Sequence, residues 1–191
     1  MTTLRRARAR LTTAAWAIYL MSAYNHRNCQ SLFGYAAEVH VRSRGRCQLC
    51  GCGDPRDPRY FDLWRQMTVE HVIGRSQQGY LDQVRDCVAQ RFPELPRAEQ
   101  ESIARRIDAA NTVTACSFCN STTSRVRHPK SMPDLLAEVS GDPDEVLRHI
   151  EAELLEIVLQ KRRSVRWKLE AIQEAFDRDV LPHLLAPPDT P

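Results

Sequence analysis

The chain has 191 residues, of which 42% are hydrophobic and 27% are charged. This apolar content excludes a wholly disordered protein, and the length allows one domain with extensions or two small domains. No apolar run approaches the roughly 18 residues that a membrane-spanning helix needs. The net charge of +3 is uneven, because residues 1–46 contain eight arginines and one acidic residue, Glu38. A basic segment of this kind favours a polyanionic partner, although it also occurs as a solubilising terminus.

The N-terminal part of the chain is expected to be helical. Residues 3–24 place apolar side chains on one helical face, and residues 31–42 predict a second helix or helical turn. The arginine-rich start resembles a secretory leader, but no persuasive cleavage site follows the apolar run. We therefore expect a helix in a cytoplasmic protein, with secretion as the alternative. Residues 51–59 are rich in Gly, Pro and Asp and predict a loop.

The middle of the chain alternates between short strands and helices. Strands are expected at residues 67–73 and 111–115, with a turn at residues 74–79 after the first strand. Residues 81–92 and 96–110 between the strands have helical periodicity, and residues 117–126 are expected to form a helix after the second strand. The two intervening helices should bury Leu81, Val84, Val88, Ile103 and Ile107.

A long C-terminal helix is predicted to begin at Asp142. Asp142 can cap the helix, Pro143 suits the first turn, and apolar residues recur at near-helical spacing as far as Val180. This apolar stripe predicts either a core face or a seam for a homodimer or a protein partner. The basic residues between Lys161 and Lys168 are expected to form a solvated face, with a phosphate-contacting stripe as the alternative.

Four of the seven cysteines form two C-x-x-C pairs, Cys47 with Cys50 and Cys116 with Cys119. Two such pairs that converge on one point supply the four thiolates of a tetrahedral structural Zn²⁺ site. A disulfide framework is the competing interpretation, but an odd cysteine count leaves one thiol unpaired. Cys52 is an alternative zinc ligand. The other two cysteines, Cys29 and Cys87, are interpreted as small core residues.

Further polar residues lie between and beside these pairs. Glu70 and His71 are adjacent on the first predicted strand, Asn111 begins the second, and Asn120 directly follows Cys119. Histidine suits proton abstraction near neutral pH. Carboxylate and amide oxygens suit Mg²⁺ or Mn²⁺, whereas thiolates suit zinc. The sequence therefore predicts two different metal sites.

The order C-x-x-C, Glu-His, Asn, C-x-x-C-Asn resembles the HNH endonuclease family, in its four-cysteine zinc form with asparagine as the third signature residue. The resemblance covers residues 46–127. It implies an α+β fold, here mainly helical: a small zinc-braced ββα-metal nuclease core with helical flanks. The expected organisation is an N-terminal basic helical segment (1–44), the nuclease core (45–128, with a helical insertion at about 80–110) and a C-terminal helical segment (129–191).

The resemblance also implies a role for each residue. His71 would be the general base that activates water for hydrolysis of DNA. Glu70 and Asn120 would coordinate a catalytic Mg²⁺ or Mn²⁺ ion, and Asn111 would brace the loop and orient His71. Arg75, Arg125 and Arg127 are expected to contact DNA phosphates.

Three features depart from the family pattern. Gly74 replaces a frequent proline, Thr123 replaces a frequent basic residue, and 39 residues separate His71 from Asn111. Two alternatives also stay open. One is a non-catalytic zinc-stabilised module that binds DNA or protein, and the other is a nuclease subunit of a larger defence or phage complex.

Overall fold

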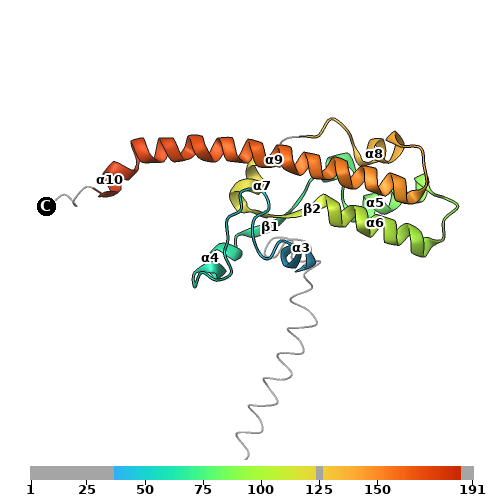
Figure 1. Cartoon of the computed structure of the whole chain (residues 1–191), viewed down its shortest axis with the longest axis horizontal. Helices are drawn as coiled ribbons and strands as arrows, with labels where there is room; N and C mark the ends of the chain where they lie inside the picture. The colour runs from blue at the N-terminus through green and yellow to red at the C-terminus, as the bar shows by residue number, and fades with distance from the viewer. Residues whose placement is uncertain (1–36, 124–126, 186–191) are drawn as a thin grey trace, which may run out of the picture.

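The computed structural model describes residues 37–123 and 127–185. The expected helix over residues 3–24, Cys29 and Arg125 lie outside this part of the chain. The described part is mainly helical with a small two-stranded sheet, which confirms the α+β class (Figure 1). None of its helices combines the length and the apolarity required to cross a membrane.

The sheet is an antiparallel pair whose two strands lie far apart in sequence. Strand β1 (Met67–His71) pairs with β2 (Thr112–Cys116), with Met67 opposite Cys116 and His71 opposite Thr112. Both strands were expected, but β1 ends at His71 rather than at residue 73. Asn111 ends a helix instead of beginning β2. Helix α7 (Ser117–Thr123) starts directly after β2 and packs against both strands.

The connection between the strands is a pair of packed helices, as expected. After the short 3-10 helix η1 (Arg75–Gln77) come α5 (Leu81–Arg91) and α6 (Arg97–Asn111). The predicted core residues of these helices are buried except Leu81, which is only half-buried. Helix α8 (Met132–Glu138), which the sequence interpretation missed, packs on α5.

Two short helices lie on the N-terminal side of the sheet. Helix α3 (Ala37–Arg42) packs against β2, and Ser43 Oγ just after it lies 2.9 Å from Thr114 Oγ1. The expected loop over residues 51–59 is followed by α4 (Tyr60–Trp64), a second helix that was not expected. The Tyr60 hydroxyl donates to Gly45 O at 2.7 Å and so ties α4 to the chain just before Cys47.

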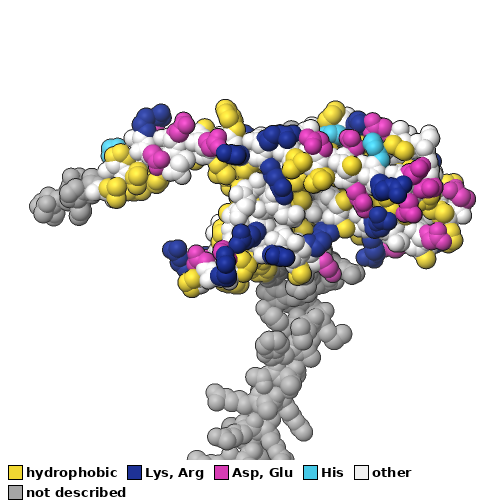
Figure 2. All heavy atoms as spheres, viewed as in Figure 1, with side chains coloured by type: hydrophobic (Ala, Val, Ile, Leu, Met, Phe, Trp, Pro, Cys, Tyr) yellow, Lys and Arg dark blue, Asp and Glu magenta, His cyan; other side chains and the backbone are white. Residues whose placement is uncertain are grey.

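The long helix α9 (Pro143–Asp179) starts where expected, because Asp142 Oδ1 accepts a hydrogen bond from Glu145 N at 2.9 Å. Its first part packs on α6 and α8, and further along it contacts α7. Its buried residues end at Val165. Beyond that point α9 and α10 (Leu181–Leu185) extend away from the rest of the described chain (Figure 1). Figure 2 shows hydrophobic side chains along this extension.

Candidate functional site

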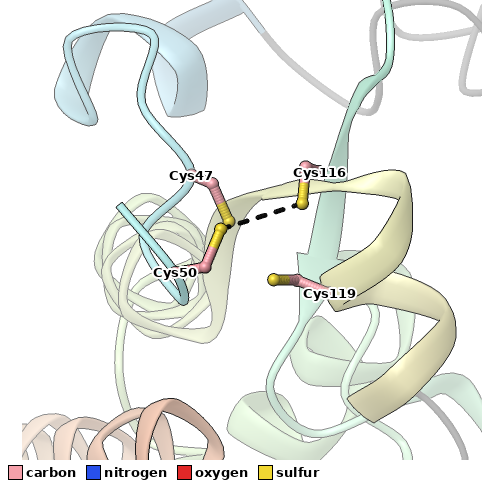
Figure 3. A group of neighbouring side chains, drawn as sticks. All are labelled: Cys47, Cys50, Cys116 and Cys119. Atoms are coloured by element: carbon pink, nitrogen blue, oxygen red, sulfur yellow. Dashed lines mark hydrogen bonds between the residues drawn. The ribbon is translucent and has the colours of Figure 1, made fainter. Parts of the chain in front are cut away.

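The two C-x-x-C pairs meet in space. Cys47 and Cys50 lie in the loop after α3, Cys116 ends β2, and Cys119 lies in the first turn of α7 (Figure 3). Their sulfur atoms all lie within 4.8 Å of one another, and Cys50 Sγ is 3.9 Å from Cys116 Sγ. Tetrahedral Zn–S bonds of about 2.3 Å require sulfur atoms at comparable separations. The four cysteines could therefore hold a metal ion such as zinc.

The local backbone explains why the first pair converges. Gly51 directly follows Cys50 with φ +81°, a left-handed conformation that glycine adopts without strain. Its amide donates to Cys47 O at 2.8 Å, which closes the turn and directs both thiols to the same side. On the other side, the change from strand to helix between Cys116 and Ser117 brings the second pair to the same point.

The four thiols differ in their acidity. Hydrogen bonding with Cys116 lowers the pKa of the Cys47 thiol, and hydrogen bonding with Cys119 lowers that of Cys116 to about 6. Burial raises the pKa of Cys50, and hydrogen bonding with Cys116 raises that of Cys119. Metal binding requires all four as thiolates, so it would release protons from the cluster. Among the described cysteines all thiols are free, so no disulfide competes for these ligands. Cys52 is not one of the four clustered ligands, and hydrogen bonding with Cys116 raises its pKa.

A polar cavity of about 610 Å³ lies at the end of β1. Of the sequence-predicted site residues, it is lined by Glu70, His71, Arg75, Asn120 and Arg127. The fold thus gathers side chains from β1, the following turn, α7 and the segment after it. Asn111 is fully buried and does not line the cavity, and Arg125 lies outside the described residues.

His71 contributes a ring that is largely shielded from water. It stacks on Tyr80, with ring centroids 4.1 Å apart and an angle of 23° between the planes. Burial lowers the pKa of His71 to about 4, although the charge of Asp82 opposes this shift. The imidazole is therefore neutral at pH 7 and can accept a proton. The guanidinium of Arg75 lies 5.5 Å from the centroid of the same Tyr80 ring.

Glu70 is a buried carboxylate with a cationic partner. Its Oε1 accepts a hydrogen bond from Lys161 Nζ at 2.7 Å, and both side chains are less than a tenth exposed. Thr123 Oγ1 lies 3.4 Å from the same oxygen. Sequence reasoning did not identify Lys161 as a site residue, because the basic residues around it were expected to be solvated. That expectation is wrong for Lys161 and holds for its neighbours Arg162 and Arg163, which are exposed.

A signal for Lys161 was present in the sequence. Lys161 follows Val158 by three residues and precedes Val165 by four, so it lies on the apolar face of the helix. A single cation on such a face predicts a buried partner of opposite charge. Tyr80 was also missed as a site residue, and neither its type nor its position before α5 would have indicated a contact with His71.

The two asparagines occupy different positions. Asn120 Nδ2 donates to Thr68 Oγ1 at 2.7 Å, which leaves its carbonyl oxygen available as a ligand. Asn111 braces the turn after β1: its Oδ1 accepts from Ile73 N at 2.7 Å, and its Nδ2 donates to Ile73 O and Gly79 O. Gly79 approaches Ile73 so closely that a Cβ at position 79 would clash with the Ile73 backbone. These contacts fix the ends of the turn that connects His71 to Tyr80.

Comparison with protein-family models, with curated proteins and with solved structures finds no match.

Proposed function

We propose that the chain is a metal-dependent endonuclease of the HNH type, which hydrolyses DNA phosphodiester bonds. One observation carries the proposal. A neutral histidine, a carboxylate, an amide oxygen and two arginines line the same cavity, although Glu70 and Asn120 are separated by the whole helical insertion. Phosphodiester hydrolysis needs a proton acceptor, stabilisation of developing negative charge, and contacts that hold the phosphate.

In this proposal His71 takes the proton from the attacking water. Burial lowers its pKa to about 4, so the imidazole is neutral at pH 7 and is a weaker base than an ordinary histidine. Stacking against Tyr80 fixes the plane of the ring, and the hydrogen bonds of Asn111 hold the turn that carries Tyr80. A general base must be held within hydrogen-bond distance of its water, so both contacts position it.

Glu70 and Asn120 would hold the divalent ion. A carboxylate and an amide carbonyl are the hard oxygen donors that Mg²⁺ and Mn²⁺ take, and both side chains reach the same cavity. When bound, such an ion supplies Lewis-acid polarisation of the phosphate and stabilises charge on the leaving oxygen. Arg75 and Arg127 line the same cavity and would bind the non-bridging phosphate oxygens, as the sequence-predicted Arg125 would also do.

The four-cysteine cluster would hold a structural zinc ion that braces this site. Cys119 and Asn120 are neighbours in α7, so fixing the thiolate also fixes the amide. The zinc would clamp the loop of Cys47 and Cys50 to the start of α7 and thereby hold α7 against β1. A closed four-thiolate site leaves no open position for water, so this metal would take no part in the hydrolysis.

A plasmid-nicking assay tests the proposal. The full chain should nick supercoiled DNA with Mg²⁺ or Mn²⁺. The nicking should stop when EDTA is added. His71→Ala should abolish nicking while zinc content and the thermal unfolding midpoint stay close to the parent. His149→Ala is the matched control, because it removes an imidazole that contacts Glu138 and does not line the cavity. Its nicking rate should equal that of the parent.

Nicking by His71→Ala at the parental rate would remove the general-base assignment. Nicking that persists in EDTA would remove the divalent ion from the reaction. Each result contradicts a different part of the proposal.

The buried ion pair favours a second candidate, a non-catalytic zinc-stabilised module that binds DNA or protein. A carboxylate paired with Lys161 at 2.7 Å can serve structure alone. This candidate predicts that His71→Ala and Asn120→Ala leave DNA binding unchanged, and that no variant or parent chain cleaves. The nicking assay and a DNA-binding titration together separate the two candidates.

A further inference from the structure

Helix α9 contributes a buried ammonium group to the cavity. Lys161 emerges from the packed face of α9, between the buried residues Val158 and Val165. Its Nζ lies 2.7 Å from Glu70 Oε1, and the two side chains are 8% and 7% exposed. Lys161 also lines the cavity itself, so its charge faces the same space as His71 and Asn120.

The two contacts of Glu70 are both made to one oxygen. Lys161 Nζ and Thr123 Oγ1 contact Oε1, and no described residue makes a hydrogen bond to Oε2. The ammonium group of Lys161 therefore lies where a metal ion could otherwise bind Oε1, and it orients the carboxylate of Glu70. A divalent ion that binds Glu70 has to bind beside this ammonium or displace it.

The charge of the cavity wall opposes a free cation. Among its described lining residues Glu70 is the only acid, whereas Arg75, Arg127 and Lys161 are cations. Such a wall attracts a phosphate and repels Mg²⁺ through the same field. Once a phosphodiester lies in the cavity, its negative charge offsets this repulsion and supplies a further oxygen ligand.

We propose that Lys161 holds Glu70 in the absence of DNA and makes divalent-ion binding depend on DNA. This inference rests on the proposed nuclease function and assigns Lys161 as a positioning residue of the same site. By linkage, DNA must tighten ion binding by the same factor as the ion tightens DNA binding. The ion pair thus keeps divalent-ion binding weak until a DNA phosphate lies in the cavity.

Mn²⁺ binding, followed by the loss of the free-ion electron paramagnetic resonance signal, tests this directly. All variants are made in the full chain with His71→Ala, so that a DNA duplex can be added without being cleaved. Lys161→Met keeps the length of the side chain without its charge, and Lys161→Arg is the matched control that keeps the charge. Lys161→Gln is a second neutral variant that can still donate a hydrogen bond to Glu70, in case the methionine variant does not fold.

With the native lysine, Mn²⁺ affinity should rise on the order of tenfold or more when the duplex is added. Without DNA, Lys161→Met and Lys161→Gln should bind Mn²⁺ on the order of tenfold tighter than the native lysine. Adding DNA should raise the Mn²⁺ affinity of these two variants by a smaller factor than that of the native lysine. Lys161→Arg should behave as the native residue. Adding Glu70→Gln to Lys161→Gln should remove the gain, since the carboxylate is then absent.

Two results without DNA would overturn the inference. One is equal Mn²⁺ affinity of the protein with the native lysine and of both neutral variants, and the other is tight Mn²⁺ binding by the protein with the native lysine. The proposed function is judged separately, by Mg²⁺-dependent nicking with native His71. Nicking with no effect of Lys161 on Mn²⁺ affinity overturns only the inference. Absence of nicking, with the expected Mn²⁺ gains, overturns only the proposed reaction.

Discussion

The imidazole of His71 stacks on the phenol ring of Tyr80, with their centroids 4.1 Å apart. The two residues lie on either side of the turn that follows β1, so the shape of this turn sets the environment of the imidazole. Replacing Tyr80 should therefore change the pKa of His71, although the two residues lie nine positions apart in the sequence.

Tyr80→Ala should raise the pKa of His71 from about 4 toward its ordinary value of 6.5, because water then reaches the imidazole. The titration can be followed by the imidazole signals in ¹H–¹⁵N nuclear magnetic resonance spectra. Tyr80→Phe is the control, since it keeps the stacked ring and removes only the hydroxyl. A His71 pKa that is the same in Tyr80→Ala and in Tyr80→Phe would contradict the role given to the stacked ring.

The lowered pKa of His71 also makes stability depend on pH. His71 has a pKa of about 4 in the folded protein, whereas in an unfolded chain its pKa is near the ordinary value of 6.5. Between these values the unfolded state binds more protons, so acid lowers the free energy of unfolding. The contribution of neutral His71 to the free energy of unfolding is fully present above pH 6.5 and is lost as the pH falls toward 4.

Urea unfolding at a series of pH values checks this dependence. Replacement of His71 by asparagine should flatten the slope between pH 6.5 and 4 relative to the parent chain. The control is Tyr80→Phe, which keeps the stacked ring beside His71 and should leave the slope unchanged. An unchanged slope in the position 71 variant would show that other groups cause the acid sensitivity.

Asn111→Ala should destabilise the protein by about 2–5 kcal/mol, because it leaves three buried backbone groups without their hydrogen-bond partner. Those groups are the amide and carbonyl of Ile73 and the carbonyl of Gly79. Asn120→Ala is the matched control, since this half-buried residue makes one hydrogen bond, to Thr68 Oγ1. Urea unfolding should give a clearly smaller loss for Asn120→Ala. Equal losses would contradict the bracing role.

Removal of the zinc ion proposed for the four-cysteine cluster should unfold the part of the chain around the cluster. We expect about one zinc per chain by atomic emission, and Cys116→Ser should lose the metal and lower the thermal unfolding midpoint. The control is Cys87→Ser, because the Cys87 thiol is buried in α5 and donates to Gln78 Oε1 instead. Cys52→Ser should retain zinc. Loss of zinc in that variant would make Cys52 a ligand in place of one of the four.

The exposed part of α9 should mediate a homodimer. Leu169, Ile172 and Phe176 are 37–50% exposed and continue the apolar face that Val165 ends. Their alternating spacing of three and four residues is typical of a coiled-coil seam. Light scattering should find a dimer at micromolar concentration for the parent and a monomer for the double change Ile172→Glu and Phe176→Glu. Ala171→Glu adds charge away from this stripe and should leave the dimer intact, whereas a monomeric parent would contradict the prediction.

The sequence predicted local elements better than long-range contacts. Alternating β-branched residues located β1 and β2 to within two residues, and the Asp142 cap located the start of α9. The cysteine spacing predicted the cluster, because two C-x-x-C pairs have one common geometry with a metal. The short helices α4 and α8 have too few turns for a periodic signal. The position of Lys161 on the apolar face of α9 indicated a buried cation, but its partner, Glu70, lies 91 positions away, and no local pattern identifies that partner.

The distance between β1 and β2 along the chain has a consequence for the order of folding. Each candidate metal centre takes its ligands from both sides of the inserted helices: two thiols and Glu70 precede them, and two thiols and Asn120 follow. Pairing strands across residues 72–111 carries a loop-closure cost that the local packing of α5 on α6 offsets. We therefore expect this helical hairpin to form first during synthesis. A nascent chain that has not yet reached α7 would hold only half of each ligand set, so the proposed nuclease site would stay inactive while the chain is still on the ribosome.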